Sequence, residues 1–330
     1  MRSNCKVILV LLVCVFYQVF TTRFAWADTF SLSADARDNV VGELRYITAL
    51  RQDTLLDIGR DAGMGYEEII KANPDVNRWV PGSGTRVLLP NLYVLPQAPM
   101  DGIVLNLPEL RLYYYSPAKK GVPRTVSTYP VSIGRMDWRT PLGKTKIVKK
   151  EKDPPWRPTE SIRREHAAEG DILPPFIPGG SPENPLGRFA LRLGIPQYLI
   201  HGTDDRKAYG IGMRVTHGCV RMYPEDIRRL FSQVVVGTPV LIVDQPIKAG
   251  RRGNSLLLEV DGAFEEEGVT HTTVSVSRAM ELLQAKAGGP ARIDAELVAQ
   301  VVRRGDGVPV VVGSTSTYSV DYDARSVPFR

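Results

Sequence analysis

The stretch from Tyr198 to Met222 reads YLIHGTDDRKAYGIGMRVTHGCVRM and contains two of the chain's four histidines and one of its three cysteines. Its first three residues are apolar and β-forming, which predicts a buried strand that ends at His201. A loop with three glycines follows, and fourteen residues separate His201 from Thr216. We expect this loop to fold back and bring Cys219 beside His201, and the rest of the chain to present these two side chains.

Cys219 beside His201 is the arrangement that a thiol nucleophile needs. A free cysteine has a pKa of about 8.5, and only its thiolate attacks readily. The His201 imidazole would take the proton or hold the anion near neutral pH. Gly218 has no side chain, so peptide N–H groups around Cys219 can point toward the oxyanion of a tetrahedral intermediate. A helix predicted from Pro224 to Val234 would bring the positive end of its dipole near the thiolate.

The sequence Thr216-His217-Gly218-Cys219, fourteen residues after His201, resembles the signature of the L,D-transpeptidases, cysteine enzymes that remodel bacterial peptidoglycan. The Val-Arg-Met that follows is similar to the enterobacterial-type branch. The likeness runs from about residue 101 to about residue 247, with RLYYY at 111–115, RTPLGKTKI at 139–147 and NPLGRFALRLG at 184–194. It implies that Cys219 is the nucleophile, that His201 is the proton donor and acceptor, and that His217 and Gly218 line the oxyanion site.

The resemblance also implies a reaction. Cys219 attacks the carbonyl at the L centre of meso-diaminopimelate in a tetrapeptide stem, D-alanine leaves, and an amine resolves the thioester. The amine belongs to diaminopimelate of a neighbouring stem or to the terminal lysine of an outer-membrane lipoprotein. Water as the acceptor would make the protein a carboxypeptidase or amidase. We expect a carbapenem or a thiol reagent to label Cys219 faster at neutral pH than it labels a simple thiol.

Three further residues near the motif are assigned to substrate binding, namely Arg221, Thr216 and Gly202. The planar guanidinium of Arg221 could hold a substrate carboxylate through two hydrogen bonds. It could equally pair with Asp226 or with the loop acids at 204–205. The sequence leaves these alternatives open.

No metal or cofactor is predicted. His201, His217 and Cys219 can all bind zinc, but a structural site generally needs four ligands, and no Cys-x-x-Cys or paired-histidine spacing supplies the fourth. No concentrated tract of lysine and arginine argues for nucleic acid as a partner. The expected partners are peptidoglycan stem peptides, the glycan, and an outer-membrane lipoprotein as acyl acceptor.

Residues 1–27 have the pattern of a secretory signal. Two basic residues precede a largely apolar run over residues 7–20, and Ala-Trp-Ala at 25–27 is a small-x-small cleavage site. The alternative is an uncleaved anchor, although the run is shorter than the roughly 20 residues that span a bilayer. Cleavage would place the protein in the periplasm with Cys219 as its one thiol and a net charge of +3. A lone thiol there is a candidate reactive group, or else a small buried hydrophobe.

Residues 28–98 are predicted to form a small module with its core at 46–90. Asp53 or Thr54 would cap a first helix, a second follows around residues 66–71, and strands flank both helices. Strand, two helices and strand resemble the lysin motif (LysM), which binds the N-acetylglucosamine-containing glycan of cell walls. The alternative is an α+β spacer without affinity for sugar. A second hypothesis for the whole chain is a glycan-binding scaffold in which the cysteine region is inert.

Residues 99–247 are predicted to form the catalytic domain, with one helix among seven strands in a mostly antiparallel β structure. This agrees with the sandwich of mixed sheets that the resemblance implies. A proline-containing linker at 91–100 would lead into it. The proline-rich segment 152–185 is expected to be a long loop without regular elements, either a stiff lid over the site or a plain surface loop. The strands are expected at 103–106, 110–115, 125–133, 144–149, 188–193, 198–201 and 240–244.

Residues 248–330 read as a small α/β appendage, with strands at 255–260 and 309–312 and helices at 274–287 and 293–303. We expect a structural or partner-binding extension without a site of its own. The fold class is therefore mainly β with α+β additions: a β-sandwich-like catalytic domain between a small βααβ module and a C-terminal appendage.

Overall fold

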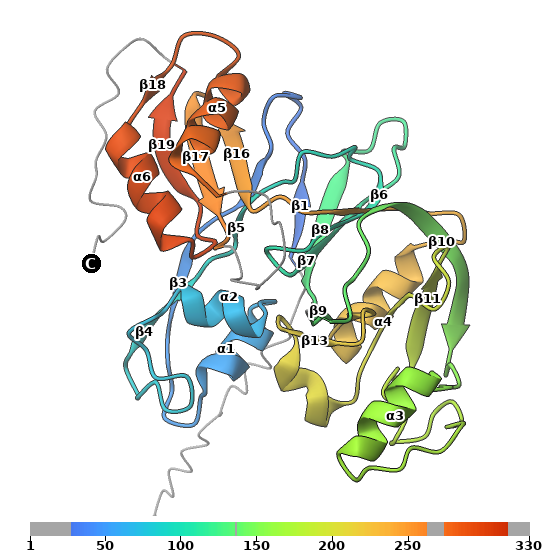
Figure 1. Cartoon of the computed structure of the whole chain (residues 1–330). Helices are drawn as coiled ribbons and strands as arrows, with labels where there is room; N and C mark the ends of the chain where they lie inside the picture. Colours follow the sequence, from blue (N-terminus) through green and yellow to red (C-terminus); the bar gives the residue numbers. More distant parts are fainter. Residues whose placement is uncertain (1–27, 136, 263–273, 316–330) are drawn as a thin grey trace, which may run out of the picture.

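The computed structural model describes residues 28–135, 137–262 and 274–315, and the predicted signal sequence lies outside them. Within these ranges no helix is both long and apolar enough to cross a membrane. The central feature is a nine-stranded sheet (Figure 1). Across it lie β1 (Thr29–Ser31), β8 (Thr125–Pro130), β7 (Arg111–Tyr115), β6 (Gly102–Asn106), β15 (Pro239–Val243), β10 (Gly143–Lys152), β11 (Phe189–Leu193), β12 (Leu199–His201) and β14 (Val220–Arg221).

This sheet is mostly antiparallel, and the prediction of a mainly β domain is confirmed. Only the pairs β6–β15 and β12–β14 within it are parallel. Strand β10 joins its two halves: residues 143–146 pair with β15 and residues 147–152 with β11, with an irregularity between Ile147 and Lys149. Such a bulge bends a strand. Apolar side chains from both halves and from helix α4 (Pro224–Gln233) therefore share one core.

The βααβ arrangement predicted for residues 46–90 is present. Strands β3 (Arg45–Thr48) and β4 (Arg86–Leu89) pair in an antiparallel manner and enclose α1 (Leu55–Asp61) and α2 (Tyr66–Lys71). The Thr54 hydroxyl accepts the Asp57 N–H at 3.0 Å, which caps α1. The module has its own apolar core.

The module packs directly on the loop that precedes Cys219. The Tyr66 N–H at the start of α2 donates to the Ile211 carbonyl at 2.8 Å. Arg60 pairs with Glu225 of α4 at 2.9 Å. Both contacts join the N-terminal module to the catalytic region without a spacer.

The segment predicted as a linker is partly a buried strand. Residues 92–94 form β5 (Leu92–Val94), which pairs with β2 (Val40–Gly42) and whose three residues are all buried. Leu92 and Val94 pack in one cluster with Leu257 of the C-terminal region. The linker expected at 91–100 is therefore wrong over its first half, because these apolar residues cover a neighbouring sheet instead of facing water.

The C-terminal region forms a four-stranded sheet in the order β16 (Ile247–Arg252), β17 (Ser255–Val260), β19 (Val310–Ser314) and β18 (Arg292–Ile293). Helices α5 (Val276–Ala287) and α6 (Ala295–Arg304) pack against this sheet around a shared core (Figure 1). The two helices and two strands predicted there are confirmed.

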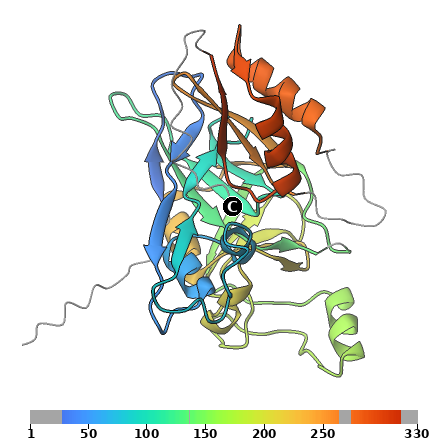
Figure 2. The same cartoon turned by 90° about the vertical axis from the view of Figure 1, so that its left-hand side faces the viewer.

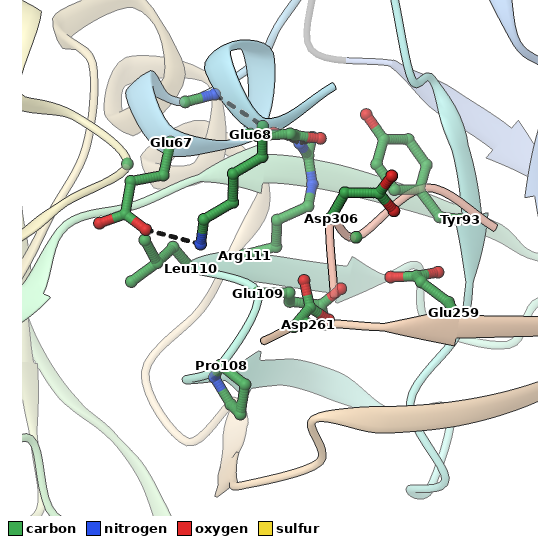
Figure 3. Close-up of a pocket in the computed structure, with 14 residues that line it drawn as sticks. Glu67, Glu68, Tyr93, Pro108, Glu109, Leu110, Arg111, Glu259, Asp261 and Asp306 are labelled. Atoms are coloured by element: carbon green, nitrogen blue, oxygen red, sulfur yellow. Dashed lines mark hydrogen bonds and ion pairs between the residues drawn. The ribbon is translucent and has the colours of Figure 1, made fainter. Parts of the chain in front are cut away.

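A buried group of charges lies where the C-terminal sheet meets the catalytic region (Figure 3). The Lys248 ammonium contacts Glu259 at 2.6 Å and also pairs with Glu109. Asp261 completes a set of three carboxylates whose oxygens lie within 4.8 Å of one another. A small cavity of about 30 Å³ adjoins these acids, and its wall also includes residues of α2.

The segment 152–185 contains a helix, so the expectation of a loop without regular elements is wrong. Helix α3 (Glu160–Ala168) has a Thr159 N-cap and no buried residue. It projects from the body of the protein (Figure 2). Because none of its residues is buried, the sequence shows no apolar stripe from which it could have been predicted.

Candidate active site

The register of two short strands brings His201 and Cys219 to the same face of the large sheet. In the parallel pair β12–β14, Ile200 lies opposite Val220 and His201 opposite Arg221. Continuing this register places Cys219 opposite Leu199. Alternate residues of a strand share a face. Since Ile200 and Val220 point into the core, His201 and Cys219 point to the other face.

The floor beneath the sulfur is apolar. Cys219 packs against a cluster of Leu186, Ala190 and Leu199, which Trp156 from the segment 152–185 also joins. The thiol lies 3.7 Å from the Gln197 carbonyl. Burial raises the pKa of the Cys219 thiol, while the Leu199 backbone and the charge of Arg192 act in the opposite direction.

His201 is held as a neutral base. It is buried, and its Nδ1 lies 2.6 Å from the Gly202 carbonyl oxygen. A carbonyl only accepts, so this contact fixes the proton on Nδ1 and leaves the lone pair on Nε2. Burial and the nearby charge of Arg221 lower the pKa of His201 to about 4.

Burial of both groups favours a neutral thiol and a neutral imidazole at rest. The expectation from the sequence is that His201 takes the thiol proton or holds the thiolate near neutral pH. The helix dipole does not change this resting state, because Ile227 and Leu230 of α4 pack in the core, on the opposite side of the sheet from Cys219.

Thr216 and Gly218 shape the loop that carries the nucleophile. The Thr216 hydroxyl donates to the Cys219 carbonyl at 2.6 Å and accepts the Gly218 N–H at 3.2 Å. The Gly218 N–H is thus already used, unlike the open donor expected from the sequence. Gly218 has φ +97°, and a Cβ there would lie 2.8 Å from the Tyr198 ring, so only glycine fits. The Thr140 hydroxyl donates to the Gly218 carbonyl at 2.8 Å.

His217 faces helix α3. Its Nε2 lies 3.0 Å from Oε2 of Glu165, and the same carboxylate pairs with Arg135. The imidazole also meets the edge of the Trp138 ring, with centroids 5.1 Å apart. The predicted place of His217 at the oxyanion site has no support from these contacts, which tie it to the segment 152–185.

Arg221 and Gly202 have mainly structural contacts. Arg221 is half-buried beside His201, and its Nε has no hydrogen-bond partner among the described residues. Burial lowers the pKa of Arg221, and the charge of Asp204 acts in the opposite direction. Gly202 accepts from His201 and donates its N–H to the Phe189 carbonyl at 3.1 Å.

Sequence reasoning missed two residues at this site. Arg192 of β11 lies opposite Leu199, which in turn lies opposite Cys219. It could have been found from its alternation with apolar neighbours in the sequence 184–194. Glu165 had no such signal, because it belongs to a polar helix in a segment rich in proline.

Comparisons with known proteins identify the family of the chain. A family model of the L,D-transpeptidase catalytic domain (YkuD) matches residues 101–242. The chain is 35% identical over 310 residues to the probable L,D-transpeptidase YcfS of Escherichia coli K12, which covers 88% of this chain and 93% of that protein. The probable L,D-transpeptidase YbiS of the same strain is 36% identical over 297 residues, covering 87% and 92%.

A solved structure is also similar over part of the chain. The catalytic domain of the Enterococcus faecium L,D-transpeptidase is 22% identical, covers 45% of this chain and 100% of that chain, and has a TM-score of 0.33. The assignment therefore rests on the two sequence relatives, which match over nearly their whole length. On that basis the chain belongs to the L,D-transpeptidase family.

Proposed function

We propose that the protein is a periplasmic L,D-transpeptidase in which Cys219 attacks the bond between meso-diaminopimelate and D-alanine in a tetrapeptide stem. The observation that supports this most is the common sheet face of Cys219 and His201, with the imidazole fixed by the Gly202 carbonyl. The relatives YcfS and YbiS are named as probable enzymes of the same activity.

The reaction uses His201 twice. As sulfur bonds to the scissile carbonyl carbon, Nε2 takes the thiol proton and the carbonyl oxygen becomes an oxyanion. The intermediate collapses, the carbon–nitrogen bond breaks, and D-alanine leaves with the proton from His201. An amine then attacks the thioester, gives its proton to Nε2, and releases the thiol of Cys219. The acceptor is diaminopimelate of another stem or the lysine of an outer-membrane lipoprotein.

Mass analysis of digested peptidoglycan after incubation with the purified protein tests this proposal. Cys219→Ala is expected to abolish new products, and intact-protein mass spectrometry should show one carbapenem adduct on the wild type and none on the variant. New stem-to-stem links, attached lipoprotein peptide or trimmed stems identify diaminopimelate, lysine or water as the acceptor. A Cys219→Ala protein that still releases D-alanine from stems would refute the enzyme mechanism.

The segment 152–185 is proposed to act as a lid over the thiol. Trp156 from this segment packs against the cluster that contains Cys219, and Glu165 of α3 contacts His217 beside the nucleophile. These contacts attach both ends of the segment's first half to the site. A closed lid would exclude water, which favours an amine as the acceptor over hydrolysis.

The βααβ module is proposed to bind the glycan. Leu50, Trp79 and Val80 are 43%, 57% and 70% exposed, respectively. The Leu55 N–H donates to the Arg78 carbonyl at 2.9 Å, so the two loops that carry these side chains are adjacent. Exposed apolar groups gathered in this way mark a binding surface. An exposed tryptophan is suited to stack on the face of a sugar ring.

A further inference from the structure

We propose that Arg192 binds the free carboxylate of the terminal D-alanine and thereby selects stems that end one residue beyond the scissile bond. This inference rests on the proposed function. It adds to that function the residue that recognises the C-terminal carboxylate of the donor stem. Arg192 lies outside the motif at 216–219, and strand pairing within the sheet brings it to the site.

Strand register places Arg192 in the same row as the nucleophile. Arg192 of β11 lies opposite Leu199 of β12, and the β12–β14 register puts Leu199 opposite Cys219. Neighbouring strands are about 4.8 Å apart, so the backbones of Arg192 and Cys219 are separated by roughly 10 Å. All three side chains point to the face that carries His201. The long side chain of arginine can cover most of that gap, and its positive charge acts to lower the pKa of the Cys219 thiol.

The guanidinium of Arg192 is held through its Nε, and its two Nη groups remain available to a ligand. Its Nε donates to Glu151, and the structure gives it no other hydrogen bond within the described residues. Glu151 also accepts from Lys149 at 2.8 Å, so its charge is shared between two cations. The Arg192 side chain is 37% exposed. The two Nη groups are therefore free to form a bidentate pair with a carboxylate.

The chemistry of the donor fits this position. In a stem that ends in D-alanine, the terminal carboxylate is three bonds from the scissile carbonyl carbon. One more residue converts that carboxylate into a neutral amide, which cannot form the charged pair. Arg221, the arginine first considered for this role, is half-buried beside Asp204 and has less freedom to meet the substrate.

Two donors and two variants test the assignment. The donors are a stem tetrapeptide with a free terminal carboxylate and the same peptide with a terminal carboxamide, and the readout is kcat/KM for release of the last residue. The wild type is expected to prefer the free acid by on the order of 10- to 100-fold. Arg192→Gln should act on both donors with similar kcat/KM, and Arg192→Lys should restore part of the preference.

Arg45→Gln is the matched control, because Arg45 is also a partly exposed arginine with one carboxylate partner, Asp28 at 3.1 Å. It should keep the wild-type preference. Two results with Arg192→Gln would refute the role of Arg192 and leave the proposed function intact. One is an equal loss of kcat/KM on both donors, and the other is a preference for the free acid that survives the substitution. If the wild type released no residue from either donor while Cys219 still reacted with iodoacetamide, the proposed function would fail together with this inference.

Discussion

Oε2 of Glu165 lies 3.0 Å from Nε2 of His217, and this contact joins helix α3 to the residue two positions before Cys219. The hydrogen bond from Arg135 keeps the pKa of Glu165 below its usual value, so the carboxylate stays charged. Because α3 buries no residue of its own, its position depends on polar contacts of this kind.

Glu165→Gln is expected to lower the rate of carbapenem acylation several-fold while leaving the melting temperature nearly unchanged. The amide keeps the shape but loses the charge that pairs with Arg135 and His217. The control is Glu160→Gln, which removes a carboxylate of the same helix that pairs with Arg163. Equal acylation rates for both variants would show that the contact with His217 does not hold the lid.

The resting protonation of the active-site pair gives a prediction about pH. Because burial raises the pKa of Cys219, iodoacetamide should alkylate it more slowly at pH 7 than it alkylates N-acetylcysteine. This reverses, for a small neutral reagent, the faster labelling expected from the sequence. Rapid alkylation with a plateau between pH 5 and 7 would instead reveal a preformed ion pair of thiolate and imidazolium.

The turnover reaction should show a different pH dependence. Since the pKa of His201 is lowered to about 4, the imidazole stays neutral and able to accept a proton throughout mildly acidic conditions. Release of D-alanine is therefore expected to persist at pH 5.5 and to fall only as pH drops toward about 4. An acid limb near pH 6.5 would mean that His201 titrates as an exposed histidine.

Two glycines that adopt nearly the same φ angle allow the effect of steric crowding to be separated from the effect of backbone strain. Gly218 has φ +97° and Gly237 has φ +96°, but a Cβ would meet the Tyr198 ring at 2.8 Å only at Gly218. Alanine at either position should cost on the order of 1–3 kcal/mol in backbone strain. Only Gly218→Ala is expected to lower carbapenem acylation, by at least about tenfold, because it displaces the loop that carries Cys219. Equal acylation by both variants would contradict this.

Glycan binding by the βααβ module can be separated from catalysis. Trp79→Ala is expected to reduce co-sedimentation with purified sacculi several-fold and to leave carbapenem acylation unchanged, because Trp79 lies on the module's exposed surface. Val236→Ala removes a similarly exposed apolar group after α4 and serves as the control. Unchanged sedimentation of Trp79→Ala would favour the alternative of a spacer.

Local patterns in the sequence predicted where helices and strands form more reliably than which other elements they pack against. The helices α1, α2 and α4 could be predicted because each has a cap or an N-terminal proline and an apolar face. Helix α3 has a good cap at Thr159 but no apolar face, so periodicity could not reveal it. Strand β5 could not be predicted, because a three-residue apolar run beside prolines gives no sign of the sheet that it covers.

At the site, the sequence indicated which residues meet but not how their protons are distributed. Strand endings and loop length predicted that His201 and Cys219 lie close together, and the strand register places both side chains on the same face of the sheet. Burial lowers the pKa of His201 and raises that of Cys219, and the apolar surroundings of Cys219 include Leu186, which is distant in sequence. The two hydrogen bonds between the Thr216 hydroxyl and the backbone could not be predicted either, because they depend on the conformation of the turn at 216–219.

The buried acids beside Lys248 (Figure 3) give a prediction about stability. Burial raises the pKa of Asp261 to about 7, with the charges of Glu109 and Glu68 acting in the same direction and those of Lys248 and Lys71 opposing them. An unfolded aspartate has a pKa of about 3.9, so between pH 4 and 7 the folded state binds more protons than the unfolded state. Stability from this group is thus greatest at low pH and falls as pH rises toward 7.

Asp261→Asn should remove this dependence, because the amide mimics the protonated acid at every pH. Chemical denaturation is expected to show a variant more stable than the wild type by on the order of 2 kcal/mol at pH 8, with the difference vanishing near pH 4. Asp75→Asn, at an exposed position of the βααβ module, should show no such pH-dependent gain. A variant of Asp261 that is less stable than the wild type at pH 8 would show that the carboxylate is held there in its charged form by Lys248.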